Sequence, residues 1–436
     1  MKRHAFYLLS AILFIGSTSV AQTAHAQIVN EQEVERILNT LAADDMEGRA
    51  SFTPGIEKAA DFIADEYRKI GLEEFGTENY RQTFYMSRIT PGNSEVVLDG
   101  NTLQAQQVIV SSTNPGINWN DDPHVEILRI QEGEEFATRY RALTTGGKDA
   151  LVIVDPSFES LFNRYKGFTS RSRVSPPTGA NVSTPSVVFV LADQIPTSFR
   201  VSFTNEIETM PLSNMIGYIP GKSKPEEYVI FSAHYDHIGI IQAVGQDSIA
   251  NGADDDASGV SAVISLAKYY KDLDNNERSL LFVAFTAEEI GLIGSQHFSR
   301  QMDPDQVVAM INIEMIGKDS RFGQDALYVT GFTHSNLAQI MQENVKGTAF
   351  EFHPDPYPTQ NLFYRSDNAS LAAAGVPAHS FSTVQIEKDE HYHQVTDEVS
   401  TLNINNIISS IKAIAIGAQS IVSGKDTPTR VEKLER

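Results

Sequence analysis

The spacing of apolar residues changes along the chain, and each spacing predicts a different kind of structure. Residues 30–48 and 53–75 carry apolar residues at helical spacing, with Pro54 in a first turn and Gly71 at an expected helix end. From about residue 85 to 211, short apolar runs alternate with Pro, Gly, Ser and Asn, which is typical of a β-rich domain. From residue 214 onward, strand-like and helix-like runs alternate.

This alternation predicts an α/β fold. Its expected strands are residues 214–221, 227–237, 278–289, 307–317 and 378–383. Its expected helices are residues 256–270, 291–302, 336–345 and 367–375. Strands that alternate with helices form a mixed, largely parallel sheet that helices cover on both faces. We therefore expect such a sheet, with a smaller β-rich domain inserted before it.

The first 26 residues have the pattern of a secretory signal peptide. Lys2 and Arg3 precede an apolar run at residues 5–16, and Ala24 and Ala26 complete an A-x-A cleavage site. We therefore expect an exported protein, either periplasmic or extracellular. The rest of the chain divides into N-terminal helices at 27–95, the β-rich insert at 96–211, the α/β domain at 212–425 and a polar tail at 426–436.

Composition narrows the possible functions. The 436 residues include no cysteine, so disulfides are excluded and any metal must bind to His, Asp and Glu. A net charge of -22 argues against binding to nucleic acid or to an anionic membrane surface. No later apolar run is long enough to predict a membrane span. Oligomeric state is not readable from these features.

Ligand-type residues stand at the carboxyl ends of several predicted strands. They are His234, Asp236, His237, Glu288, Glu289 and Glu314, joined by the aspartates of "GADDDASG" at 252–259 and by "EHYHQVTD" at 390–397. Ligands bind at this edge in open α/β sheets. One such residue is ordinarily a solvated or core group, but a cluster of carboxylates at one edge needs cations. Imidazole and carboxylate together suit zinc or a similar divalent ion.

These segments resemble the M28 family of zinc metallopeptidases, which is rich in aminopeptidases. The motifs are "HYDHIG", "GADDDASG", "TAEEIGLIGS", "NIEMIG" and "YHQVTDEVS", and residues 41–72 are similar to the segment before the catalytic domain in bacterial members. The resemblance implies a zinc-exopeptidase fold with its catalytic domain at 212–425. The insert stands where many members carry a protease-associated domain, and we expect it to restrict access rather than to supply ligands.

The resemblance also implies a role for each matching residue. The implied ligands of two Zn²⁺ ions per chain are His234, Asp255, Glu289, Glu314 and His393, with Asp255 as the bridge and Glu314 where many members have Asp. Glu288 would be the general base for a metal-bridging water. Asp236 would accept the second N–H of His234, and His237 would have a supporting role. Tyr392 either donates to the oxyanion or packs as an aromatic. A cis peptide is implied between Asp255 and Asp256.

The sequence thus favours an exported di-zinc peptidase that acts on peptides or proteins, with an aminopeptidase as the first hypothesis. Two enzyme alternatives are a glutaminyl-cyclase-like acyltransferase with a single zinc, and a carboxypeptidase or dipeptidase on the same scaffold. A binding module that has lost its metals is an alternative of another class. The five ligands and Glu288 are all present, which argues against that module and against a single-zinc site.

Overall fold

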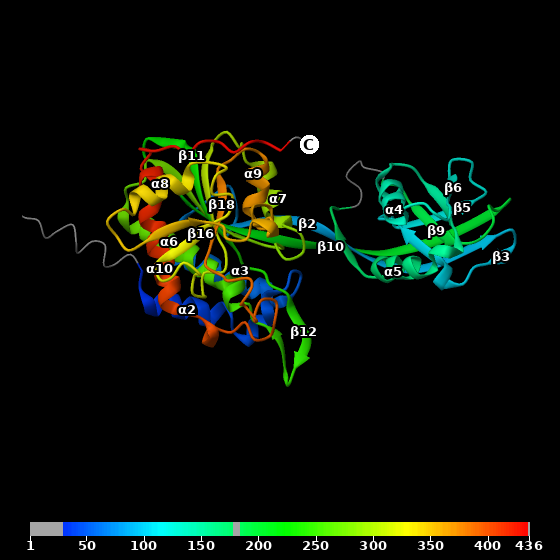
Figure 1. Ribbon diagram of the computed structural model, residues 1–436, viewed down its shortest axis with the longest axis horizontal. Helices are drawn as coiled ribbons and strands as arrows, with labels where there is room; N and C mark the ends of the chain where they lie inside the picture. The colour runs from blue at the N-terminus through cyan, green and yellow to red at the C-terminus, as the bar shows by residue number, and fades with distance from the viewer. Residues whose placement is uncertain (1–28, 178–183, 435–436) are drawn as a thin grey trace, which may run out of the picture. The chain divides into compact units, whose positions relative to one another are not determined.

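The computed structural model describes residues 29–177 and 184–434 (Figure 1), so the expected signal peptide lies outside the described residues. The chain divides into two compact units. One contains the described residues before Thr83 and after Leu212, and the other is Thr83–Leu212. The second unit begins earlier than the boundary expected at residue 96, because β2 (Arg81–Leu98) is one uninterrupted strand. None of the helices in the described residues is long and apolar enough to cross a bilayer.

The first unit is built on a mixed, largely parallel sheet, as predicted. Its strands lie in the order β17 (Glu351–Pro354), β16 (Ala326–Val329), β18 (Ala378–Ser382), β15 (Val307–Ile313), β11 (Lys224–His234), β14 (Arg278–Phe285) and β10 (Phe199–Ile219). The central pairs β14–β11, β11–β15 and β15–β18 are parallel. Antiparallel pairing occurs where β10 joins β14 and where β16 joins β18. The parallel centre brings the carboxyl ends of four strands to one edge.

Helices cover both faces of this sheet, because side chains on each central strand alternate between two cores. Phe231 and Phe282 belong to the core on one face, whereas Ile230 and Leu281 belong to the core on the other. The first face packs against α2 (Glu31–Leu41), α3 (Pro54–Ile70), α6 (Gly259–Leu273), α8 (Leu337–Asn344), α10 (Ile404–Gly417) and α11 (Gln419–Val422). The second face packs against α7 (Ile293–Gln301) and α9 (Asn368–Ala373).

Helix α3 shows how local sequence sets an element's ends. Pro54 occupies the first turn, and Gly71 ends the helix with a left-handed φ of 80° while its N–H donates to the carbonyl of Tyr67. Two small elements complete the unit. They are β1 (Glu73–Glu74), which pairs with β10, and the hairpin of β12 (Gly239–Val244) and β13 (Asp247–Ala250).

The second unit is rich in strands, and it also contains two helices that the sequence pattern did not indicate. Its sheet has the order β4 (Val108–Ser111), β9 (Val187–Leu191), β7 (Ala150–Val154) and β6 (Glu126–Ile130), with β2, β3 (Asn101–Thr102), β5 (Gly116–Asn120), β8 (Arg173–Ser175) and part of β10 beside it. The helices are α4 (Phe136–Thr145) and α5 (Glu159–Thr169). Each fully buries one side chain, Phe136 and Phe162, so neither shows a clear apolar stripe.

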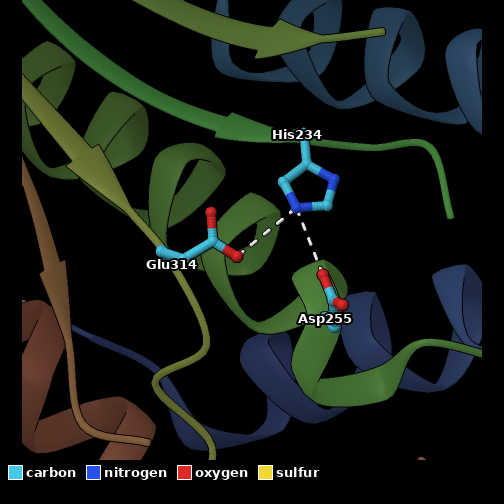
Figure 2. Close-up of side chains that lie close together, drawn as sticks. All are labelled: His234, Asp255 and Glu314. Atoms are coloured by element: carbon cyan, nitrogen blue, oxygen red, sulfur yellow. Dashed lines mark ion pairs between the residues drawn. The ribbon is translucent and has the colours of Figure 1, made fainter. Parts of the chain in front are cut away.

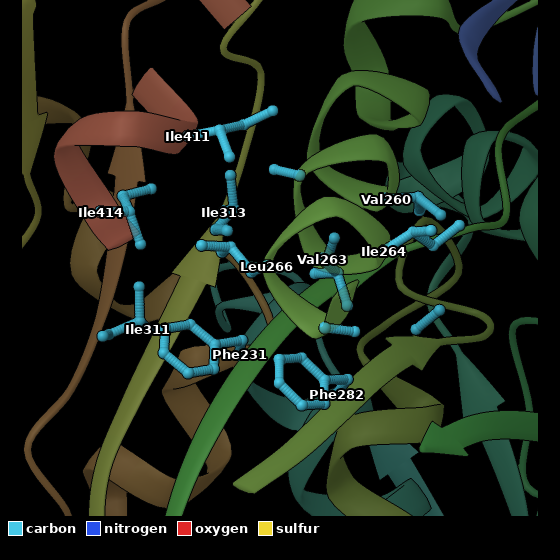
Figure 3. Packing of buried hydrophobic residues seen from close by; sticks show 14 of the residues in the cluster. Phe231, Val260, Val263, Ile264, Leu266, Phe282, Ile311, Ile313, Ile411 and Ile414 are labelled. Carbon is cyan, nitrogen blue, oxygen red and sulfur yellow. The ribbon is translucent and has the colours of Figure 1, made fainter. Parts of the chain in front are cut away.

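Phe231 is a sensitive point of the larger core. Its ring stacks on those of Tyr270 and Phe282, with centroids 5.3 Å and 5.6 Å away, and Figure 3 shows it below the side chains of α6 and α10. We expect Phe231→Ala to lower the free energy of unfolding by about 3–5 kcal/mol, because a buried cavity remains. Ile240 is 67% exposed, so Ile240→Ala should change it by less than about 0.5 kcal/mol. Urea unfolding of both variants checks this, and similar losses would contradict it.

Candidate metal centre

Six side chains meet beyond the carboxyl ends of the parallel strands. They are His234 at the end of β11, Glu288 and Glu289 after β14, Glu314 directly after β15, His393 in the segment after β18, and Asp255 in the short turn η5 (Ala253–Ser258) that precedes α6. Adjacent parallel strands end at the same edge, so residues distant in sequence become neighbours. Asp255 belongs to two groups of potential metal ligands there. His234 and Glu314 complete the first group, and Glu289 with His237 or His393 completes the second.

The first group consists of His234, Asp255 and Glu314. The Nε2 atom of His234 lies 3.2 Å from Asp255 Oδ1 and 3.4 Å from Glu314 Oε1. Figure 2 shows both carboxylates directed at this nitrogen from different segments. Zinc binds nitrogen and oxygen ligands at about 2.0–2.2 Å, so three donor atoms at these separations can share one ion.

The second group uses the other oxygen of Asp255. Asp255 Oδ2 lies 3.3 Å from His393 Nε2, which is also 3.0 Å from Glu289 Oε2. Asp255 therefore presents one oxygen to each group, which is the arrangement of a bridging carboxylate. The peptide bond between Asp255 and Asp256 is cis, as the sequence resemblance implied.

His237 lies beside this second group. Its Nδ1 atom is 2.8 Å from Glu289 Oε1 and 3.8 Å from Asp255 Oδ2, and a potential ligand group of these three residues is therefore also present. The short contact with Glu289 fits the supporting role expected from the sequence. An N–H donated by His237 to one oxygen of Glu289 leaves the other oxygen directed at His393.

The charge of this cluster fits a cation site. Burial would raise the pKa of Asp255, but His234, His237 and His393 lower it below its usual range. The carboxylates of Asp255 and Glu289 raise the pKa of His393 to about 10. The Nε2 atom of His393 is buried and faces both carboxylates without a hydrogen bond of regular geometry, as expected for donors that converge on a cation. Imidazoles and carboxylates are the donors of zinc sites, so the residues fit this metal.

Aspartates that are not ligands hold the backbone around the ligands. Asp256 accepts the N–H of His234 at 3.3 Å through Oδ2 and that of Met315 at 3.1 Å through Oδ1. Asp397 accepts the N–H of Asp255 at 3.0 Å. These hydrogen bonds fix the segments that carry three of the ligands.

The contact of Asp236 with His234 uses the backbone carbonyl, whereas the sequence predicted the carboxylate. The Nδ1 atom of His234 lies 3.0 Å from the backbone carbonyl of Asp236, whereas the carboxylate is 3.8 Å away. The carboxylate instead accepts the N–H of Glu288 at 3.0 Å and of Glu289 at 3.3 Å. The chain turns after β11 so that the carbonyl faces the imidazole, and the side chain is free to hold the next strand end.

A cavity of about 340 Å³ opens beside the ligands. Its wall includes Glu288 and Tyr392 together with His234, Asp255, Glu289 and Glu314. Burial raises the pKa of Glu288 well above its usual range, and the carboxylates of Asp367 and Glu314 add to this against the opposing effect of His234. Tyr392 is 45% exposed and stacks on His393 with ring centroids 3.9 Å apart. Both residues therefore border the space next to the potential metal ligands.

Three residues of this region were not assigned roles from the sequence. Ser366 donates to Glu314 Oε2 at 2.7 Å, Asp397 holds the bridging loop, and Arg49 is fully buried behind it. Asp397 stands in the same motif as His393, so its position was a usable signal. Neither Ser366 nor Arg49 has such a signal, because their contacts join segments far apart in the chain.

Comparisons with known proteins point to the same family as the sequence resemblance. Residues 214–416 match the model of the family described as peptidase family M28. The chain is 25% identical over 275 residues to leucine aminopeptidase 1 of Paracoccidioides brasiliensis, covering 59% of this chain and 69% of that protein. It is 24% identical over 452 residues to aminopeptidase YwaD of Bacillus subtilis, covering 98% of this chain and 94% of that protein.

A solved structure shares the fold. A zinc aminopeptidase from Bacillus subtilis superimposes with a TM-score of 0.52 at 16% sequence identity, over 93% of this chain and 99% of that one. At this identity the likeness concerns the fold alone.

Metal binding should release protons. In the metal-free protein the pKa of His393 is raised to about 10, so its imidazole holds a proton at pH 7 that a cation must displace. We expect about two zinc ions to bind per chain, with an affinity that falls as pH is lowered. Metal analysis and calorimetry in buffers of different ionisation enthalpy measure both effects. Trace zinc without gain on reconstitution, or binding without proton release, would contradict the assignment.

Proposed function

We propose that this chain is an exported aminopeptidase that uses two zinc ions. The premise is that residues 214–416 belong to peptidase family M28 and that the chain is a zinc metallopeptidase. The observation that carries the proposal is the position of Asp255 between two His-carboxylate groups, with Glu288 outside both groups. The names of the relatives, leucine aminopeptidase and aminopeptidase, support the same activity. The pattern of residues 1–26 supports export.

His234, Asp255 and Glu314 would hold one zinc ion, and Asp255, Glu289 and His393 the other. A pair of divalent ions acidifies water and polarises a peptide carbonyl. Glu288 ligates neither ion and borders the cavity. Burial raises its pKa, but two bound cations would favour its ionised form, so its carboxylate would be available to accept the proton of the attacking water. The same carboxyl group then donates that proton to the departing amine nitrogen as the peptide bond breaks.

Tyr392 would donate to the developing oxyanion. Its ring lies on the imidazole of His393, so its position is tied to a metal ligand. Burial and the carboxylates of Asp255 and Glu289 raise the pKa of Tyr392, which keeps the phenol protonated as a donor at neutral pH. A hydrogen bond that strengthens as charge develops on the carbonyl oxygen stabilises the transition state.

The remaining charges of the cavity favour recognition of a free amino group. With the ligands and Glu288 assigned, Asp389 and Glu390 are the further carboxylates in its wall. Asp389 Oδ1 accepts the N–H of His391 at 3.0 Å, while its Oδ2 is buried without a hydrogen-bond partner. An α-ammonium group can supply the missing donor. Arg365 is the one permanent cation among the described residues of the wall. A carboxypeptidase would need such a cation to bind the carboxylate of its substrate, so Arg365 is the residue that would support that alternative.

The uncharged rest of the wall consists of Thr330, Gln394 and three serines together with an apolar part. The apolar part includes Met315, Tyr328, Leu362, Val384 and Ile386. Apolar walls favour an apolar side chain through burial of surface, at roughly 25 cal/mol per Å². We therefore propose that the residue removed is preferentially apolar.

Glu288 and Glu289 should separate chemistry from metal binding. Glu288→Ala should keep both ions but lower kcat roughly 10²–10⁴-fold with little change in KM, because general-base help acts in the transition state. Glu289→Ala should lower zinc content together with activity. Steady-state kinetics and metal analysis of the same preparations test this. Near-normal turnover of metal-loaded Glu288→Ala would refute the mechanism.

A substrate panel tests the type of peptidase. Aminoacyl, carboxy-terminal and N-glutaminyl substrates are assayed with and without chelator, and we expect chelator-sensitive cleavage of aminoacyl substrates, fastest for apolar residues. Asp389→Asn should raise KM for these substrates about tenfold or more, since the negative charge that strengthens the hydrogen bond from the ammonium group is lost. Arg365→Met is the matched control and should change KM little. The reverse result, with cleavage of carboxy-terminal substrates, would indicate a carboxypeptidase.

A further inference from the structure

A single buried arginine connects the two backbone segments that carry His234 and Asp255. Arg49 is fully buried, and its guanidinium donates to four backbone carbonyls. Nε donates to Tyr235 at 2.9 Å, Nη2 to Gly252 at 2.8 Å, and Nη1 to Asn251 at 2.5 Å and Leu41 at 2.6 Å. A guanidinium with all its contacts made to carbonyls fixes backbone positions, because its donors diverge in a rigid plane.

The carbonyls belong to the segments that carry the metal ligands. Tyr235 is the residue after His234, and Gly252 begins the loop that leads to Asp255. The backbone of Arg49 adds a further tie, because its own carbonyl accepts the N–H of His237 at 3.2 Å. One residue of the N-terminal segment thus holds the end of β11 and the start of the bridging loop together.

Gly252 permits this close approach. Its φ is +57°, and a Cβ built there would lie 2.6 Å from the ring of His237 and 2.3 Å from the carbonyl oxygen of Asp255. No side chain fits in this space, so the loop can lie against His237 with its carbonyl facing Arg49.

Arg49 also supplies a permanent positive charge. Burial lowers its pKa, while the carboxylates of Asp255, Asp397, Asp236 and Asp256 act in the opposite direction. An arginine stays protonated in proteins. Bound zinc ions would balance the carboxylates that hold them, whereas Asp236, Asp256 and Asp397 have no metal ligand role. A fixed cation behind them reduces the repulsion that would separate these loops in the metal-free protein.

We propose that Arg49 is a positioning residue that sets the separation of His234 from the bridging Asp255 before any metal binds. The inference rests on the two-zinc centre proposed above. It assigns part of the zinc affinity to a residue that touches neither ion nor substrate. Loss of such an outer partner typically weakens metal binding about 10–100-fold.

Arg49→Lys tests the inference, with Arg278→Lys as the matched control. Arg278 is also buried, at 1% exposure, and it donates to the carbonyls of Ile421 and Asp426, both at 2.7 Å, near the start of β14. Both variants lose a buried fork of donors and should be less stable. Arg49→Lys alone should weaken zinc binding about 10–100-fold and change the visible spectrum of the cobalt-substituted protein. Competition with a chelator and cobalt spectra measure these effects.

Each result has a distinct meaning. If the natural protein binds no zinc, the proposed function fails. If it binds zinc and Arg49→Lys matches Arg278→Lys in affinity and cobalt spectrum, Arg49 is only structural and the inference is wrong. If Arg49→Lys does not fold, hydrogen exchange of the metal-free natural protein tests whether the segments are already held in place without metal. The amide of His237, which donates to the carbonyl of Arg49, should be protected without metal, and fast exchange there would overturn the inference.

Discussion

Buried negative charge at one edge of the sheet is the constraint on which the rest of this structure depends. A carboxylate removed from water is destabilising unless a cation or hydrogen-bond donors replace its solvation. At the carboxyl ends of β11, β14 and β15 the chain meets this demand in three ways. Some carboxylates converge on imidazoles in the geometry of a metal site, others accept backbone N–H groups, and Arg49 adds a fixed cation behind them.

The run of three aspartates shows how these roles are divided among neighbours. Asp255 is shared by the two ligand groups. On either side of it, Asp254 Oδ1 accepts the N–H of Gly317 at 2.6 Å and Asp256 Oδ1 accepts that of Met315 at 3.1 Å. The outer two aspartates therefore tie the bridging loop to the segment that carries Glu314. The same run of like charges supplies one carboxylate shared by both ligand groups and two backbone anchors, which explains why all three positions are acidic.

Much of this arrangement follows from sequence, because strand ends and ligand-type residues are local features. The sheet, its helices on both faces and the convergence of His234, Glu289 and Glu314 could be predicted from alternating patterns. What could not be predicted depends on contacts between distant segments. Ser366 contacts Glu314 and Arg49 contacts Gly252, and neither contact produces a periodic pattern in the sequence. Helices α4 and α5 could not be predicted, because each fully buries a single side chain and therefore has no clear apolar stripe.

Backbone conformation, rather than residue type alone, separates the work of Glu288 and Glu289. Consecutive residues of a regular strand point to opposite faces, so two neighbours serving one site require a turn. Ala287 supplies it with a φ of 56°, a left-handed value that costs a non-glycine residue about 1–2 kcal/mol. Met315, directly after Glu314, and His393 itself also have left-handed φ values, of 47° and 57°. The hydrogen bonds from Glu288 and Glu289 to Asp236, and from Met315 to Asp256, hold two of these turns in place. The aspartates that bind no metal thus stabilise the backbone conformations that aim the ligands, so the site's geometry depends on residues outside both ligand groups.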